Sequence, residues 1–261
     1  MAEKSFGLRL KWLGCACFEM DFGGVTVVND PWITPNPNTD LDWEAVEKCD
    51  YITVTHGHYD HIMDIPALMK KFDSYVICGE NTAVPLMKWA DLNPTRVFPI
   101  YPDMELDADD VKIKALYGRH NLRAGGWNQL DKVWQRHAMT DGDPDLIELN
   151  KWGDFEYRNF LFTATDGCKV LMWGTPLYHP IQRNTLLNQK ADIIMMMPTK
   201  RYPAVDTAEF ISKTGCKAVI VQHIDYPNDK TEFVNLLKKE LEKRAPEIRF
   251  IVPKYGEWME L

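Results

Sequence analysis

The sequence has no long hydrophobic run. Its apolar stretches, such as DIIMMMP at 192–198, are as long as a strand, whereas a helix that spans a membrane needs about 18 or more apolar residues. The N-terminal residues MAEKSFGLRLKW contain no apolar segment of the length that a signal peptide requires. We therefore expect a cytoplasmic protein without a membrane span.

Zinc-ribbon spacing is also missing, although cysteine itself is present. The six cysteines lie at positions 15, 17, 49, 78, 168 and 216, and no two of them form a C-x-x-C pair. The chain has 261 residues, of which 45% are hydrophobic, so it can bury a sizeable core without disulfides. We expect the cysteines to be reduced and mostly buried.

Positive charge is scarce. The chain carries 30 lysine and arginine residues against 38 aspartate and glutamate residues, a formal net charge of −8. A nucleic-acid-binding surface needs clustered cations, so we expect no nucleic-acid partner and favour a small-molecule substrate. Internal repeats and low-complexity linkers are also lacking, and we predict a single domain over residues 1–261. The sequence leaves open whether this domain forms a homo-oligomer.

Strands in hairpins alternate with strand–helix–strand units along the chain. Paired glycines at 23–24 and the dipeptide Asp166-Gly167 indicate hairpin turns. Apolar runs predict strands at 8–13, 17–21, 25–29, 51–55, 74–78, 96–100, 111–117, 155–165, 168–173, 192–197 and 217–222, and helices at 62–72, 80–91, 206–214 and 229–244. This order favours mixed sheets flanked by helices.

A histidine cluster, TVTHGHYDH, directly follows one of these strands. His56, His58 and His61 crowd three imidazoles around Asp60, and groups that titrate near neutrality are costly to gather without a cation. His120 and His223 also follow predicted strands. Because loops that leave strand ends converge at one edge of a sheet, these five histidines are predicted to meet at a metal site.

The stretch THGHYDH after a strand resembles the second motif of the metallo-β-lactamase superfamily. The other motifs follow in order: VVNDPW at 27–32, His120, VLMWG at 170–174 and VQHID at 221–225, with YGEWMEL at the end. The resemblance covers nearly the whole chain and is strongest to hydrolases similar to ascorbate-6-phosphate lactonase and N-acyl-phosphatidylethanolamine phospholipase D. It implies an α/β fold, a four-layer αββα sandwich of two mixed β-sheets, with the metal site at one edge.

The resemblance also implies roles for individual residues. His56, His58 and His120 would hold a first metal, and Asp60, His61 and His223 would hold a second. Three histidines leave an open fourth position, as in catalytic zinc sites. We expect one or two zinc ions per chain, or manganese or iron in their place. Asp60 or a metal-bound water would handle the proton, and Asp30 would hydrogen-bond the loop that carries the ligands.

The sequence departs from the superfamily pattern at two positions. A metal-bridging aspartate should follow Gly174, but residue 175 is a threonine, and a hydroxyl is a poor ligand beside carboxylates. We therefore expect Thr175 near the ligands but not among them, which leaves open whether one or two metals bind. Cys15 stands in LGCACF where related proteins often have Gly-His, and we interpret it as a small buried residue near the site.

Residues 121–150 are an insertion relative to the compact members of this branch. Its stretch WNQLDKVWQRHAM favours a short helix, and the insertion is either a surface addition or a lid or subunit contact. The candidate substrate contacts are Trp32, Tyr178, His179 and Arg183, with Lys200 and Arg201 as further basic side chains. A basic residue there would bind a phosphate or carboxylate of the substrate.

Three functions fit these residues. The favoured one is a metal-dependent hydrolase that uses metal-bound hydroxide to attack an ester, lactone or phosphodiester of a small molecule. The missing aspartate motivates the second, a binding or sensing protein that keeps a metal without turnover. The third, a nuclease of the same superfamily, is disfavoured by the acidic charge. We expect no diiron oxygen-reducing role, because that branch carries a glutamate where this chain has His58.

Overall fold

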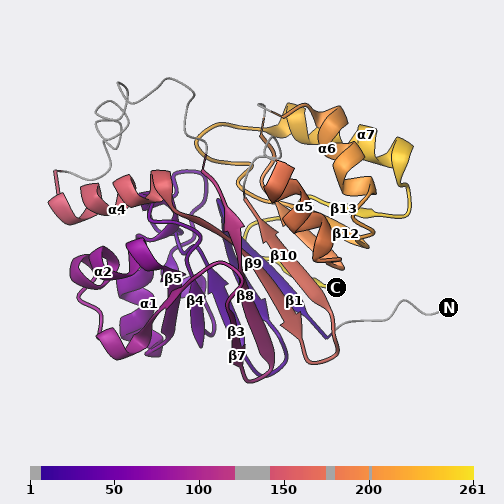
Figure 1. The fold of residues 1–261 in the computed structure, drawn as a ribbon. Coiled ribbons are helices and arrows are strands. Elements are labelled where there is room, and N and C mark those ends of the chain that lie inside the picture. Colours follow the sequence, from indigo (N-terminus) through magenta and orange to yellow (C-terminus); the bar gives the residue numbers. More distant parts are fainter. Residues whose placement is uncertain (1–6, 121–141, 175–179, 200–201) are drawn as a thin grey trace.

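The computed structural model describes residues 7–120, 142–174, 180–199 and 202–261. Two mixed β-sheets of seven strands each pack face to face, and helices cover the outer face of both (Figure 1). The chain therefore has the four-layer αββα architecture that the sequence predicts.

The first sheet is built mainly from the N-terminal part of the chain. Its strands are β1 (Arg9–Gly14), β2 (Cys17–Asp21), β3 (Thr26–Asn29), β4 (Tyr51–Thr53), β5 (Tyr75–Gly79), β6 (Val97–Ile100) and β14 (Trp258–Glu260), in the order β14-β1-β2-β3-β4-β5-β6. Strands β1 to β3 pair antiparallel, whereas β3 to β6 run parallel. The carboxyl ends of β3 and β4 therefore lie side by side.

The second sheet follows the same plan with the later strands. They are β7 (Glu105–Ala108), β8 (Val111–Gly118), β9 (Tyr157–Ala164), β10 (Lys169–Trp173), β11 (Ile193–Met196), β12 (Ala218–Val221) and β13 (Arg249–Ile251), in the order β13-β12-β11-β10-β9-β8-β7. Strands β7 to β10 pair antiparallel, and β10 to β13 run parallel. The hairpin predicted at Asp166-Gly167 is confirmed between β9 and β10.

The helices fall into two outer layers (Figure 1). On the first sheet lie α1 (Ile65–Phe72), α2 (Glu80–Trp89) and α4 (Pro144–Phe155), and on the second α5 (Pro180–Asn188), α6 (Ala204–Ser212) and α7 (Thr231–Arg244). Short 3-10 helices are η1 (Trp43–Ala45), η2 (Tyr59–His61) and η3 (Pro94–Arg96). Within the described ranges, no helix is long and apolar enough to cross a membrane.

Buried side chains fill the spaces between all four layers. The central layer, between the sheets, includes Phe18 and Met20 from one sheet and Phe160 and Met172 from the other. Two further layers lie under the helices. Each large side chain buried here contributes about 1.5–3 kcal/mol relative to exposure. All six cysteines are free and buried, as predicted.

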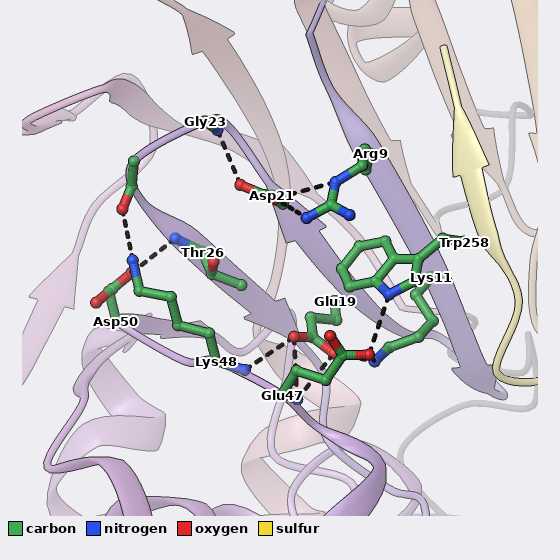
Figure 2. A network of polar contacts seen from close by, with 11 residues as sticks. Arg9, Lys11, Glu19, Asp21, Gly23, Thr26, Glu47, Lys48, Asp50 and Trp258 are labelled. Atoms are coloured by element: carbon green, nitrogen blue, oxygen red, sulfur yellow. Dashed lines mark hydrogen bonds and ion pairs between the residues drawn. The ribbon is translucent and has the colours of Figure 1, made fainter.

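A buried ion pair joins the β1–β2 hairpin to the loop that precedes β4 (Figure 2). Lys11 and Glu19 lie opposite each other in the hairpin, both almost without solvent contact, with Nζ 2.7 Å from Oε2. Glu19 accepts hydrogen bonds from the backbone N–H groups of Glu47 and Lys48. Lys11 donates to the carbonyl of Ala45. The pair thus satisfies backbone groups of a loop that would otherwise lack partners.

Several elements have no counterpart among the ranges predicted from the sequence, among them β7, β13, β14, α4 and α5. In α4, Asp143 caps the first turn by accepting from two backbone N–H groups, and Pro144 occupies its first position. The helix ends with Gly153 and Asp154, residue types that disfavour a helix interior. The strand predicted to begin at position 155 therefore begins at Tyr157, after the helix has ended.

Candidate metal centre

Three strand ends bring the predicted ligands to one edge of the sandwich, and one hairpin turn places Cys15 beside them. His56 and His58 follow β4, Asp60 and His61 lie in η2, His120 follows β8, His223 follows β12, and Cys15 lies in the β1–β2 turn. Strand β4 belongs to the first sheet and β8 and β12 to the second, so both sheets contribute. The side chains form two groups, and the ligand atoms within each lie within 4.8 Å of one another.

The first group consists of His56, His58 and His120. The Nδ1 of His56 lies 3.0 Å from the hydroxyl oxygen of Thr55. Because that hydroxyl donates its own proton to Asp30, its oxygen accepts the proton of Nδ1, and Nε2 carries a lone pair. Burial, reinforced by the neighbouring histidines, lowers the pKa of His56 well below its usual value. His56 is therefore a neutral imidazole, the form that binds metals.

Two nitrogen lone pairs face each other in this group. The Nε2 of His58 lies 3.2 Å from Oδ1 of Asp154, so it donates its proton there and leaves Nδ1 unprotonated. This Nδ1 is 3.0 Å from Nε2 of His56. Two unprotonated nitrogens repel each other at that distance unless a cation or a shared proton lies with them. Together with His120, they form a donor set that fits a divalent metal.

Asp154 is a residue of this centre that the sequence does not reveal. It is buried, and its Oδ1 lies 3.2 Å from Nε2 of His58 and 3.9 Å from Nδ1 of His120. One carboxylate therefore contacts two of the three histidines and orients them, as carboxylates behind metal-bound histidines do. In the sequence, a single acidic residue next to a predicted strand carries no distinguishing signal.

We expect the substitution Asp154→Asn to weaken metal binding at the first group by roughly 10- to 100-fold. The amide keeps the volume of the side chain but removes the charge that holds two imidazole rings. Competition between the protein and a chromophoric chelator for Zn²⁺ measures the affinity. Asp145→Asn, at the other end of α4, is the matched control and should bind as the wild type does. Equal affinity in the two variants would contradict this role for Asp154.

Helix α4 approaches the loop between β4 and η2 at two glycines. A Cβ added at Gly153 would lie 2.4 Å from Cδ2 of His58, and a Cβ at Gly57 would lie 2.6 Å from the carbonyl oxygen of Leu149. Both distances are far inside van der Waals contact, so neither position has room for a side chain. The helix is therefore part of the wall that fixes His58.

The substitution Gly153→Val should displace His58 and lower the affinity of the first group for Zn²⁺ by about tenfold or more. The valine methyl groups cannot fit against the imidazole without moving it. Glu148→Val places the same side chain on an exposed position of α4 and should leave the affinity unchanged. Zinc titration with circular dichroism as a folding check compares the two variants, and wild-type affinity in Gly153→Val would refute the steric argument.

The second group consists of Asp60, His61, His223 and Cys15. The protein holds Nδ1 of both histidines: that of His61 lies 2.9 Å from Asp30 Oδ2, and that of His223 lies 2.6 Å from the carbonyl oxygen of Tyr226. Their Nε2 atoms lie 3.8 and 3.6 Å from the carboxylate oxygens of Asp60. The free ring nitrogens and the carboxylate therefore face a common position, as the ligands of one metal would.

Burial and charge set the protonation of the second group. Burial opposes the charged form of Asp60, but the adjacent His61 and His223 outweigh it and lower the pKa of this carboxyl. At His61, burial favours the neutral form, but Asp30 and Asp60 raise its pKa. Burial, with help from Lys230, lowers the pKa of His223 to about 3. Asp60 is thus a carboxylate and His223 a neutral imidazole, the forms that coordinate metals.

Three residues around the second group adopt a left-handed backbone. Cys15, Asp30 and His223 have φ values of 47°, 46° and 54°, a conformation that is unfavourable for residues with a Cβ and that gathers at functional sites. Asp30 accepts hydrogen bonds from the backbone N–H and the hydroxyl of Thr55, both at 2.7 Å. It therefore ties the loop before His56 to the end of β3 while it also contacts His61.

The structure describes the surroundings of two of the predicted substrate contacts, Trp32 and Arg183, whose role in substrate binding stays a prediction. Trp32 is 0% exposed. Its ring centroid lies 4.6 Å from that of Tyr226 and 6.3 Å from that of Tyr59, so its side chain packs inside the protein. Arg183 lies on α5, with the centre of its guanidinium 6.0 Å from the ring centroid of Phe210.

The remaining predictions for this region fall largely outside the described residues. These are Thr175, Tyr178, His179, Lys200, Arg201 and the helix expected within WNQLDKVWQRHAM. Within the insertion predicted at 121–150, the described residues from position 144 onward belong to α4. That part packs on α2 and on the loop that carries His58.

Comparisons with known proteins agree with this geometry. The family model of the beta-lactamase superfamily domain matches residues 9–214. A UPF0173 protein of Pyrococcus abyssi is 37% identical over 113 residues, 43% of this chain and 50% of that protein. A UPF0173 metal-dependent hydrolase of Sulfurisphaera tokodaii is 28% identical over 224 residues, 82% of this chain and 96% of that protein. The chain thus spans half the length of the first of these relatives.

A solved structure shares the fold. It is that of Igni18, a metallo hydrolase from the hyperthermophilic archaeon Ignicoccus hospitalis, which superimposes with a TM-score of 0.66 at 16% sequence identity. The match covers 97% of this chain and 98% of that one. At this level of identity the likeness establishes the arrangement of the two sheets and their helices.

Proposed function

Since the chain belongs to the beta-lactamase superfamily, we propose that it is a metal-dependent hydrolase that cleaves an ester, lactone or phosphodiester of a small molecule. One observation carries the proposal: two groups of metal-ligating side chains meet at one edge of the sandwich. In each group, protein partners contact the second ring nitrogen of two histidines, which are His56 and His58 in the first group and His61 and His223 in the second. Relatives that are named metal-dependent hydrolases support it.

The donor sets support one or two zinc ions per chain. His56, His58 and His120 would hold the first ion, and Asp60, His61 and His223 would hold the second. Three imidazoles suit zinc and leave a coordination position free. Manganese and iron are the alternatives for a set that includes a carboxylate.

A bound metal would polarise the bond to be cleaved and lower the pKa of a water to near neutrality. The chain itself supplies position and a base. Asp60 is ionised, and its side chain keeps 13% of its surface exposed, so it is the proposed acceptor of the proton from the attacking water. Asp30 and Asp154 fix the imidazoles behind the metals. His120, with 29% of its side chain exposed, leaves the centre open to solvent.

For the substrate we favour lactones and phosphodiesters. This preference rests on the sequence resemblance to hydrolases similar to ascorbate-6-phosphate lactonase and N-acyl-phosphatidylethanolamine phospholipase D. Two adjacent cations would stabilise negative charge on both the attacking and the leaving oxygen of such substrates. The same edge of the fold hosts many activities, so the choice among substrates depends on loops rather than on the metal ligands.

The test is a hydrolysis assay before and after removal of the metal. We expect the protein loaded with Zn²⁺ or Mn²⁺ to hydrolyse at least one class in a panel of lactones, carboxylic esters and phosphodiesters. A chelator should reduce that activity to background, and added metal should restore it. Full metal occupancy without turnover on the whole panel would instead favour a sensing role. Cleavage of RNA with salt-sensitive binding would favour a nuclease.

A further inference from the structure

Cys15 occupies a place that the histidine pattern does not explain. Its side chain is fully buried, and Sγ lies within 4.8 Å of the ligand atoms of Asp60, His61 and His223. The other five cysteines, all of which lie in the described ranges, belong to neither group. Thiolate sulfur is among the preferred ligands of zinc, so this cysteine stands out chemically as well as spatially.

Hydrogen bonds fix the backbone of Cys15 on both sides. Its N–H donates to the two carboxylate oxygens of Asp225, at 3.2 and 3.0 Å. Its carbonyl oxygen accepts from the indole N–H of Trp12 at 3.0 Å and from the backbone N–H of His223 at 2.7 Å. The last contact joins Cys15 directly to a proposed metal ligand from the opposite sheet. The position of the thiol is therefore coupled to that of His223.

The backbone conformation at this position would suit glycine better. Cys15 has φ 47°, and a residue without a Cβ adopts that conformation readily. Asp225, which holds the N–H of Cys15, is itself held by the amide of Asn36 at 3.0 Å and the hydroxyl of Tyr255 at 2.9 Å. These hydrogen bonds thus hold Cys15 in an unfavourable backbone conformation next to Asp60.

We propose that Cys15 binds the second metal as a thiolate and completes a Cys-Asp-His-His donor set. The inference rests on the proposed function, because it requires a metal at the second group. Position 175 is a threonine rather than a metal-bridging aspartate, and Cys15 supplies a fourth donor in its place. The sulfur–metal bond forms as the S–H bond breaks, and the proton is released to the buffer.

The donor set has two consequences. Four protein ligands fill a tetrahedral zinc site, which would have to expand to five ligands to contact an oxygen of the substrate, whereas the three histidines of the first group leave a position open. Two negative charges, those of Cys15 and Asp60, balance a divalent cation. Because soft thiolate ligands select zinc or cobalt over manganese, the second site should discriminate against Mn²⁺ more strongly than the first.

Two measurements on the wild-type protein test the inference without any substitution. X-ray absorption at the zinc edge of the fully loaded protein should show a sulfur scatterer at about 2.3 Å. Replacement of zinc by Co²⁺ should produce a near-ultraviolet thiolate-to-cobalt charge-transfer band. In a titration with two equivalents of Co²⁺, the intensity of this band should rise with only one of the two equivalents. Two bound metals without a sulfur signal would overturn the inference and leave the hydrolase proposal intact. Failure to bind any metal would overturn both.

A pair of variants then assigns the sulfur. Cys15→Ser should lose the charge-transfer band. Its affinity for the second zinc should also fall by more than the roughly 10- to 100-fold that follows loss of a residue hydrogen-bonded to a metal ligand. Cys17→Ser is the matched control, because Cys17 lies in the same hairpin and is equally buried but packs in the layer under the first helices. It should keep the band. A band that persists in Cys15→Ser, or in Cys15→Ala should the serine variant misfold, would contradict the assignment.

Discussion

Replacing His56 with alanine should remove one metal per chain and lower the rate of hydrolysis by at least about 10³-fold. His56 contributes Nε2 to the first group, and its ring is held by Thr55 on one side and faces His58 on the other. Without it, two histidines remain, too few to hold a catalytic zinc firmly. Metal content by mass spectrometry, together with the rate on any substrate found in the panel, measures the effect.

The matched variant is His223→Ala, which removes a ligand of the second group instead. Each variant should lose one metal, but they should lose different ones. Under the assignment of Cys15, His56→Ala should keep the thiolate-to-cobalt band and His223→Ala should weaken it. If His56→Ala retained both metals and an activity within tenfold of the wild type, the first group would not be the metal site.

Replacing Glu19 with alanine should lower the free energy of unfolding by about 3–5 kcal/mol, the usual effect of removing one partner of a buried ion pair. Lys11 would keep Glu47, a backbone carbonyl and the ring of Trp258 as partners. The backbone N–H groups of Glu47 and Lys48 would lose their shared acceptor and would have to be satisfied by water. Urea denaturation followed by circular dichroism measures the change.

Two further variants separate this effect from a simple loss of charge. Glu242→Ala removes a carboxylate from an exposed pair with Lys238 on α7 and should change stability little. The double variant Lys11→Met with Glu19→Leu should recover part of the loss, because no buried charge is left without its partner. If Glu19→Ala were as stable as Glu242→Ala, the buried pair would not stabilise the hairpin and its loop.

Local patterns made most of the fold and the ligand loop predictable. The Asp166-Gly167 turn and the apolar runs beside it specify β9 and β10 within a few residues, because a hairpin depends on neighbouring positions. The stretch from His56 to His61 is equally local, and its crowding of imidazoles is visible in the sequence. Family resemblance then supplied His120 and His223, which periodicity alone could only place after strands.

Contacts between distant segments were not predictable in the same way. Asp154 contacts His58, which is 96 positions away in the sequence. The glycine and the aspartate in the last turn of its helix indicate only that the helix ends there. They do not indicate that this turn packs against a metal ligand. Cys15 meets Asp225 across 210 positions. Such contacts depend on how distant segments pack against each other, and the periodicity of a single sequence does not indicate that packing.

The measurement that tests the account most directly is the metal content per chain of protein purified without a chelator or a histidine tag. After reconstitution with zinc, the account predicts two metals per chain in the wild type and one in each of His56→Ala and His223→Ala. A wild type that binds no metal, even after reconstitution, would contradict the metal centre and the hydrolytic function together. An unchanged metal content in both variants would show that the metals bind elsewhere.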